Sequence, residues 1–384
     1  MWKFEAISGG EDRIRAIGFM SGTSLDGVDA AGIVTDGDRV IETGPSVFIP
    51  YSTDDQAVLS EALKAAQLIE GRDDQAPVFQ IASQVVFDRH IEAFDAIRGQ
   101  NTDWVNGCSL IGFHGQTVVH KPDIRFTYQV GSPRSLADAL GIPVVGDLRL
   151  NDVKSGGEGA PLVPAYHGAV AHHLSVEAPV VFVNIGGVAN ITSVETDLLA
   201  FDTGPGNALI DDWVRRHDRG RMDEGGKLGL EGKVEEGLVR EFLANSFFDE
   251  RPPKSLDRDS FTLEAITELS LEDGCATLAA MTGAAIAKSE RWMRDKPGTW
   301  ILLGGGRKNQ AIVSALQSRV SGRVIVAEEI QTNTAKFRLD GDMLEAQAFA
   351  YLAVRSVKGL PITFPGTTGV DAPLTGGALF TPSR

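Results

Sequence analysis

The order of apolar and polar positions predicts the same succession of elements twice along the chain. Short apolar runs that end in glycine-rich turns predict strands, and apolar positions three or four residues apart predict helices. In the first half the pattern predicts strands at 15–20, 28–34, 39–48, 108–113, 126–130 and 142–145, and helices at 54–69, 76–97 and 162–173. In the second half it predicts strands at 180–185, 191–194, 198–201, 300–303 and 324–327, and helices at 207–217, 233–248, 276–294, 309–318 and 342–357. Both halves therefore favour an α/β fold with mixed sheets.

The predicted helix at 76–97 has two apolar faces. Val78, Ile81 and Val85 recur at helical spacing, and a second apolar set follows on another face: Phe87, Ile91 and Phe94. We therefore expect this helix to be buried on two sides.

A strand, a turn of small residues and a returning strand occur once in each half. Turn 21–27 and the turn that begins with Gly186-Gly187 lie roughly one domain length apart. This repetition predicts two similar halves that face each other across a cleft. The backbone N–H groups of such turns point outward and bind phosphate without a large positive charge.

Composition and charge narrow the functional class. The 384 residues favour two domains rather than one, and 42% hydrophobic with 23% charged residues is typical of a soluble globular protein. The chain has 36 basic and 52 acidic residues, so its net charge is −16. Nucleic acids and anionic membranes are therefore not expected partners.

Nothing in the sequence indicates export, a membrane span or structural zinc. No apolar run of 18 residues occurs, and the first residues lack an apolar signal core. Cys108 and Cys275 form no paired or metal-binding pattern. We expect a cytoplasmic protein.

Turn 21–27 combines glycines, hydroxyl groups and a carboxylate directly after a strand. One interpretation is a phosphate loop, in which Asp26 or Asp29 helps to hold Mg²⁺ through water. A plain hairpin turn also uses Asp and Gly, but it needs only two residues and leaves the extra hydroxyls unexplained. No GxxxxGK[ST] sequence occurs, which excludes a P-loop protein.

Gly304, Gly305 and Gly306 follow a predicted buried strand and precede a helix. Glycines there let a flat ring or a phosphate approach the backbone at the start of the helix. They could also simply reverse the chain. Beside two predicted phosphate hairpins, we favour a nucleoside site.

Four further polar residues lie where function and structure are both reasonable explanations. Asp202 ends a predicted strand, where it could act as a general base or cap the following turn. His114 and Arg149 also lie at strand ends, where open α/β sheets bind ligands. Taken singly, a core histidine and a surface ion pair explain them as well. Glu345 either favours the helix dipole or faces the cleft.

Together these segments closely resemble the anhydro-N-acetylmuramic acid kinase family, of the acetate-and-sugar-kinase/Hsp70/actin superfamily. The matching segments follow the family's order over nearly the whole chain: residues 18–29, 114–117, 156–164, 184–187, 201–207, 252–255, 304–309 and 342–346. A single glycine turn is weak evidence, whereas this ordered set is very specific.

The resemblance implies two duplicated RNase H-like (actin/hexokinase-type) domains with mixed sheets flanking a central cleft. The domains would be residues 1–176 and 177–384, with a tail from about 361 that packs back on the first. It also implies a homodimer.

The resemblance further implies an ATP- and Mg²⁺-dependent reaction in peptidoglycan recycling. Water opens the 1,6-anhydro ring of 1,6-anhydro-N-acetylmuramic acid while the γ-phosphoryl group moves to O6, which gives N-acetylmuramate 6-phosphate and ADP. By the same resemblance Asp202 would be the base for the attacking water, Glu345 a second catalytic residue, and Arg149 a partner for the lactyl carboxylate.

The remaining implied site residues fall into two sets. The ATP set is Gly22, Thr23, Ser24, Leu25, Asp26, Gly27, Val28, Asp29, Gly186, Gly187, Gly304, Gly305, Gly306 and Asn309, with Asp26 also holding Mg²⁺ through water. The substrate set is His114, Gln116, Arg149, Gly156, Gly157, Pro161, Asn207 and Asp211.

The chain departs from the family pattern at two places. Leu150 and Asn151 stand where members often have arginines, which removes support for an extra anion contact there. After residues 252–255, Leu256-Asp257 replaces the usual Thr-Gly, which leaves the role of this loop open.

Two alternative functions remain at this point. Another sugar kinase of the same superfamily would phosphorylate a plain hydroxyl, also with an Asp base. A non-kinase ATP-binding module that cycles between conformations would carry a peptide-binding domain or filament insertions, and no such segment is visible in these 384 residues.

Overall fold

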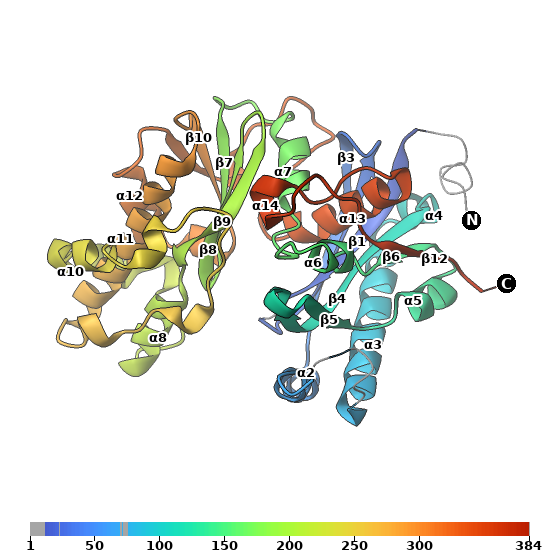
Figure 1. Cartoon of the computed structure of the whole chain (residues 1–384), viewed down its shortest axis with the longest axis horizontal. Coiled ribbons are helices and arrows are strands. Elements are labelled where there is room, and N and C mark those ends of the chain that lie inside the picture. The colour runs from blue at the N-terminus through green and yellow to red at the C-terminus, as the bar shows by residue number, and fades with distance from the viewer. Residues whose placement is uncertain (1–11, 23, 70, 72–75, 384) are drawn as a thin grey trace. The chain divides into compact units, whose positions relative to one another are not determined.

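The chain divides into two compact units, each with its own sheet and apolar core. The computed structural model describes residues 12–22, 24–69, 71 and 76–383. Unit 1 comprises Met1–His173, Thr334–Arg338 and Met343–Arg384, and unit 2 comprises Leu174–Asn333 and Leu339–Asp342 (Figure 1).

The sheet of unit 1 has seven strands in mixed orientation. They are β1 (Ile14–Ser21), β2 (Gly27–Thr35), β3 (Val40–Pro50), β4 (Leu110–Lys121), β5 (Phe126–Val130), β6 (Val144–Gly146) and β12 (Ala378–Phe380). The order is β12-β6-β4-β1-β2-β3, with β5 paired to β4. The β1–β2 and β2–β3 pairs are antiparallel, whereas β1–β4 and β4–β6 are parallel. The tail expected to pack on the first half ends in β12, which pairs with β6.

Helices cover both faces of this sheet. They are α2 (Thr53–Ala66), α3 (Pro77–Gln100), α4 (Thr102–Asn106), α5 (Pro133–Leu140), α6 (Leu150–Lys154), α7 (Pro164–Ala171), α13 (Leu344–Lys358) and α14 (Pro365–Thr368). Phe19 of β1 contacts His90 of α3, with 5.2 Å between ring centroids. The neighbouring Gly18 lies against Ala346 of α13. Because successive residues of a strand point to opposite faces, α3 and α13 cover opposite sides of the sheet.

Two glycines allow α13 to lie directly on the strands. A Cβ atom on Gly18 would lie 1.9 Å from the carbonyl oxygen of Ala346, and one on Gly112 of β4 would lie 2.0 Å from that of Phe349. Any side chain at either position would therefore displace the helix. The sequence prediction placed 342–357 in the second half, but the close approach of α13 to β1 and β4 puts it in unit 1.

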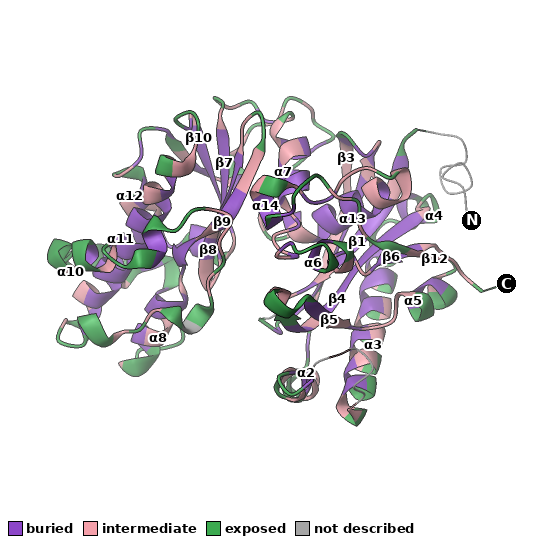
Figure 2. Cartoon of the chain, in the orientation of Figure 1, coloured by how far each residue is buried: buried purple, intermediate pink, exposed green. Residues whose placement is uncertain are grey.

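The sheet of unit 2 repeats this arrangement with five strands. They are β7 (Val180–Ile185), β8 (Val188–Val194), β9 (Leu198–Pro205), β10 (Thr299–Leu303) and β11 (Arg323–Val326). The order is β11-β10-β7-β8-β9; β7–β8 and β8–β9 are antiparallel, and β7–β10 and β10–β11 parallel. Its helices are α8 (Ala208–Arg216), α9 (Lys227–Glu231), α10 (Glu236–Phe242), α11 (Leu271–Lys288) and α12 (Gln310–Gln317). Central strands are buried in both units (Figure 2).

The topology confirms the predicted duplication. The path β3-β2-β1-β4-β6 of unit 1 has the same directions as β9-β8-β7-β10-β11 of unit 2. In each unit an antiparallel meander is followed by two parallel strands, so the α/β fold with mixed sheets is present twice.

Other expectations need correction. Ile81 is 56% exposed, so the predicted burial of α3 is wrong at this position of the first apolar set. In the second set Phe94 is buried, and the other two members are partly buried against the core. The helix predicted at 233–248 ends at Phe242, because the Asn245 side chain accepts the Phe247 N–H and begins a separate 3-10 turn. Among the described residues, no helix has the length and apolar character needed to cross a membrane.

Candidate functional site

The turn between β1 and β2 is held by its own polar groups. The Leu25 N–H donates to the carbonyl of Gly22 at 3.3 Å, with Leu25 at a φ of 54°. Asp26 is exposed, and its Oδ1 accepts from Ser24 Oγ at 2.9 Å and from the Gly27 N–H at 3.0 Å. The side chain of Val28 is fully buried, so only its backbone can meet a ligand. Thr23 lies outside the described residues.

The two glycines of this turn differ in what the fold requires. A Cβ atom on Gly27 would lie 2.2 Å from the Ile49 carbonyl oxygen, so packing alone demands glycine there. On Gly22 the nearest atom would be Ser24 Oγ at 3.6 Å, which is ordinary contact. The fold therefore leaves open space beside Gly22, as expected where a ligand approaches the backbone.

Two hydrogen bonds join this turn to β4. Gln116 Nε2 donates to the Gly22 carbonyl at 3.0 Å, and Ser21 Oγ donates to the Gly115 carbonyl at 3.1 Å. Gln116 is fully buried, and its Oε1 accepts no hydrogen bond from the described residues. Gln116 was predicted to line the sugar side; in the structure its amide nitrogen holds the turn.

Arg149 and His114 form a close polar pair in unit 1. Arg149 Nε and Nη2 lie 3.1 and 2.9 Å from His114 Nε2, and Nη1 donates to the Gly159 carbonyl at 2.7 Å. Because a guanidinium only donates, His114 Nε2 is the acceptor and the ring is neutral. Burial, and secondarily Arg149, lowers the pKa of His114 well below its usual value.

Glu345, at the start of α13, is electrostatically linked to this pair. Burial raises the pKa of its carboxyl, Arg149 opposes the rise, and Asp26 adds to it. Burial lowers the pKa of Arg149 to about 10, with Glu345 and Asp152 acting in the opposite sense. Unit 1 therefore brings together the β1–β2 turn, the His114–Arg149 pair and Glu345.

Asp152 was not predicted as a site residue, yet its carboxylate holds the glycine-rich loop 156–159, which contacts Arg149. It is 2% exposed; its Oδ1 accepts the Gly159 N–H and its Oδ2 accepts Thr368 Oγ1, both at 2.6 Å. A Cβ atom on Gly157 would lie 2.3 Å from Asp152 Oδ1, so that glycine serves packing. Gly156 has a φ of 89° and serves the turn. The sequence signal that could have identified Asp152 is its position just before a glycine-rich loop.

In unit 2, the Gly186-Gly187 turn is docked onto the segment that starts α8. The Gly206 and Asn207 N–H groups donate to the carbonyls of Gly187 and Gly186, both at 2.8 Å. Cβ atoms on Gly186 and Gly187 would meet no atom closer than 3.5 Å. These two glycines, like Gly22, are therefore open to the approach of a ligand. Asn207 makes no side-chain cap to α8.

The tri-glycine turn lies against the same hairpin. A Cβ atom on Gly304 would lie 2.4 Å from Asn184 Oδ1, and Gly304 has a φ of 71°, so the fold requires it. Gly306 packs on Ile185. A Cβ atom on Gly305 would meet only Asn207 Nδ2, at 3.7 Å. Unit 2 therefore brings Gly305 and Asn207 beside the second hairpin.

Asn309 and Arg307 support this turn structurally. Asn309 was predicted to bind ATP; in the structure its Oδ1 caps α12 by accepting the Ala311 and Ile312 N–H groups at 3.0 and 3.2 Å. Arg307, which is 3% exposed, was not among the predicted site residues. It donates to the Gly304 carbonyl at 2.8 Å and pairs with Glu328 at 2.6 Å.

Asp202 lies on β9, where the N–H of Leu256 donates to its Oδ2 at 2.8 Å. Burial raises the pKa of this carboxyl to about 6, and the Leu256 bond opposes the rise. Burial also raises the pKa of Asp211, on α8, to about 6. Each is therefore able to exchange a proton near neutral pH.

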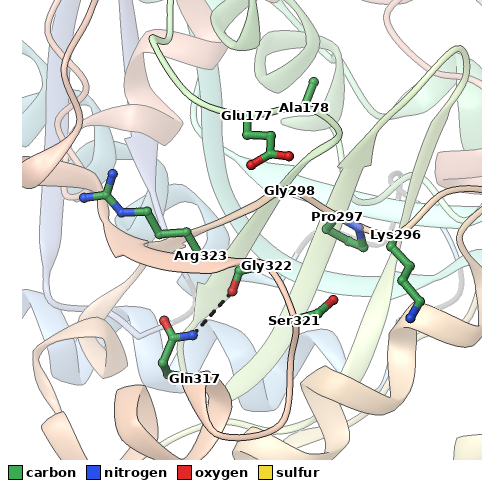
Figure 3. Close-up of a pocket in the computed structure, with 9 residues that line it drawn as sticks. All are labelled: Glu177, Ala178, Lys296, Pro297, Gly298, Gln317, Ser321, Gly322 and Arg323. Carbon is green, nitrogen blue, oxygen red and sulfur yellow. Dashed lines mark hydrogen bonds between the residues drawn. The ribbon is translucent and has the colours of Figure 1, made fainter.

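A polar cavity of about 620 Å³ lies at the opposite end of β10 from the tri-glycine turn (Figure 3). Lys296 and Arg323 line it, but their charged ends point to opposite sides. None of the predicted site residues lines this cavity. It is therefore not the predicted site.

Within the described part of the chain, no three His, Cys, Asp or Glu side chains are grouped to hold a metal ion. Asp26 is an exposed carboxylate within the β1–β2 turn. That fits Mg²⁺ bound mainly by water and phosphate oxygens, which needs only one or two carboxylates.

Comparison with known proteins gives a consistent set of matches. A family model described as anhydro-N-acetylmuramic acid kinase matches residues 14–382. A relative of that name from Methylobacterium nodulans is 44% identical over 381 residues, covering 96% of this chain and 100% of the relative. Another from Rhizobium etli is 44% identical over 370 residues, covering 96% and 98%. Among solved structures, component A of the (R)-2-hydroxyglutaryl-CoA dehydratase of Acidaminococcus fermentans is 12% identical, with a TM-score of 0.46 and coverage of 90% and 99%. No conclusion rests on this last likeness.

Proposed function

This chain belongs to the anhydro-N-acetylmuramic acid kinase family, and from that premise we propose how its residues carry out the reaction. Membership makes the chain a kinase with ATP as co-substrate and a small molecule as acceptor. The proposed acceptor is 1,6-anhydro-N-acetylmuramic acid, and the proposed products are N-acetylmuramate 6-phosphate and ADP. The proposed setting is peptidoglycan recycling in the cytoplasm.

The observation that carries this proposal is the environment of Asp202. Its carboxyl has a pKa raised to about 6 by burial and accepts one backbone hydrogen bond. At neutral pH it is mostly ionised, yet basic enough to take a proton. Asp202 would accept a proton from water as that water forms a bond to the anomeric carbon. The C1–O6 bond breaks, and O6 takes the γ-phosphoryl group.

The His114–Arg149 pair supports binding of the sugar. We propose that the Arg149 guanidinium binds the lactyl carboxylate, because it is held in a fixed orientation by His114 Nε2 and the Gly159 carbonyl. His114, neutral by virtue of burial, orients the guanidinium without adding charge. Glu345 would contribute a carboxylate beside the Arg149 guanidinium.

The open glycines support binding of the triphosphate. We propose that Gly22, Gly186, Gly187 and Gly305 let phosphate oxygens or the nucleoside reach the backbone, since the fold itself requires glycine at none of the four. Preorganised N–H groups would stabilise the charge that spreads over the transferred phosphoryl oxygens. When bound, Mg²⁺ would neutralise phosphate charge, and Asp26 would hold it through water.

A product assay with labelled water tests the reaction. Ring opening in H₂¹⁸O places one ¹⁸O atom at C1 of the phosphorylated product, which mass spectrometry detects as a shift of two mass units. A kinase that phosphorylates a plain hydroxyl gives a product without the label, and that result would refute the proposal. The homodimer that the family resemblance implies is a further proposal, which analytical ultracentrifugation tests.

A further inference from the structure

The segment Pro252–Leu256 runs beside β9 and holds Asp202 from two sides. The Asp202 N–H donates to the Lys254 carbonyl at 3.0 Å, and the Leu256 N–H donates to Asp202 Oδ2 at 2.8 Å. The segment is thus hydrogen-bonded to both the backbone and the side chain of the proposed base.

Lys254 attaches this segment to an aromatic cluster formed by Phe247, Phe248 and Phe261. Its Nζ donates to the Phe247 carbonyl at 2.5 Å and lies 4.1 Å from the centroid of the Phe247 ring. It also lies 5.8 Å from the ring of Phe201, the residue before Asp202. Cation–π contacts and a charge-assisted hydrogen bond together hold a half-buried lysine in one position.

We propose, on the basis of the proposed function, that Lys254 is a positioning residue: it holds Pro252–Leu256 against β9 and thereby keeps the Leu256 N–H on the carboxylate of Asp202. Without that N–H, the carboxylate would lose a hydrogen bond that stabilises its ionised form and fixes its direction. Lys254 does not itself touch the reacting atoms in this proposal.

The charged groups around Asp202 and Lys254 indicate how loss of Lys254 would affect the pKa of Asp202. The pKa of Asp202 responds to burial and to the Leu256 N–H, and no charged side chain of the described residues contributes to it. Glu250, Asp249, Lys288 and Arg291 act on Lys254, and burial lowers its pKa. Loss of Lys254 would therefore change the pKa of Asp202 by moving Pro252–Leu256, and not through the loss of the lysine's charge.

The test compares Lys254→Met with Lys254→Arg and Lys288→Met. Lys288 is a matched control, because its Nζ also donates to a backbone carbonyl, that of Leu243 at 3.0 Å, and lies over a cluster ring, Phe248, at 5.6 Å. It makes no hydrogen bond to Pro252–Leu256 among those described. Two readouts are used: amide hydrogen exchange of the peptide containing Leu256, and the pH dependence of kcat/KM.

In Lys254→Met we expect exchange at Leu256 to be faster by about tenfold, and the acidic limb of kcat/KM to move up by about one pH unit. In Lys254→Arg both readouts should stay near their wild-type values, because the positive charge is kept. Lys288→Met should change neither readout. An unmoved acidic limb in folded Lys254→Met, or an equal movement in Lys288→Met, overturns the proposal. Should Lys254→Met fail to fold, Phe247→Leu removes the ring beneath the ammonium and should move both readouts in the same direction by less.

Asp202→Asn separates this inference from the proposed function. If Asp202→Asn is inactive and the limb of Lys254→Met is unmoved, only the positioning role of Lys254 is wrong. If Asp202→Asn keeps wild-type turnover, Asp202 is not the base, and both proposals are wrong.

Discussion

Arg149 directs two of its guanidinium nitrogens, Nε and Nη2, at the single atom His114 Nε2, at 3.1 and 2.9 Å. Two donors on one neutral acceptor fix the plane of the guanidinium, and Nη1 is held separately by the Gly159 carbonyl. A positive charge is thus presented in a set direction without a direct ion pair to neutralise it among the described contacts. A guanidinium held in this way would let a protein with net charge −16 bind the proposed anionic substrate locally.

Arg149→Ala should weaken sugar binding and leave ATP binding unchanged. A lost hydrogen bond to a charged group corresponds to a rise in the sugar KM of about 10- to 100-fold. Arg149→Lys should recover only part of this, because an ammonium cannot reproduce the planar fork. Arg125→Ala, which removes a more exposed arginine near the same loop, is the control in steady-state kinetics. An unchanged sugar KM in Arg149→Ala would place the substrate carboxylate elsewhere.

Asp202→Asn should abolish most turnover while the protein still binds ATP. The asparagine oxygen can still accept the Leu256 N–H but cannot take a proton, so kcat should fall by about 10²–10⁴-fold. Isothermal titration with ATP checks binding, and Asp197→Asn, in the exposed turn before β9, is the control. Wild-type turnover in Asp202→Asn would contradict the assignment.

The pKa of Asp202 predicts opposite effects of pH on activity and on stability. As a base, Asp202 must be ionised, so kcat/KM should fall as the pH drops below about 6. Its folded pKa lies above the unfolded value, so the stability linked to its proton is present at low pH and is lost as the pH rises through about 6. Asp202→Asn should therefore be more stable than wild type at pH 7.5, by at most about 3 kcal/mol, and equal to it near pH 4. Thermal melts at the two pH values test this.

Gly22→Val and Gly27→Val should separate ligand binding from folding. The space beside Gly22 is open, so the variant should fold with a melting temperature near wild type but bind ATP at least about tenfold more weakly. Gly27→Val meets the Ile49 carbonyl and should unfold at lower temperature. Gly99→Ala, in open space on α3, serves as a tolerated control. Unchanged ATP affinity in Gly22→Val would show that phosphate does not approach there.

Asp152→Asn should destabilise unit 1 and weaken sugar binding together. Both carboxylate oxygens accept hydrogen bonds, from Gly159 and Thr368, and an amide can accept only one of them. The expected loss in the free energy of unfolding is about 2–4 kcal/mol, with a raised sugar KM and unchanged ATP affinity. Asn151→Ala, at the neighbouring exposed position, should change stability by less than about 1 kcal/mol. Equal stability of the two variants in urea denaturation would contradict the role of Asp152.

The sequence by itself determined the local elements and the duplication. Apolar runs broken by small-residue turns are a local property, and the strand predicted at 126–130 coincides with β5 (Phe126–Val130). The signals for α5 are also local, since Ser132 caps it and Gly141 ends it with a φ of 67°, although this helix was not predicted. The motif set identified the family, because an ordered series of motifs does not depend on knowing how they pack.

Only the tertiary structure decided which glycines serve packing and what each polar side chain contacts. Gly22 and Gly27 are alike in sequence, and only the position of Ile49 on β3 shows that one is required by the fold and the other is not. Likewise α13 lies on unit 1 because Gly18 and Gly112, far from it in sequence, leave room for its backbone. Such contacts depend on distances between segments that are remote along the chain, and no local pattern of residues encodes those distances.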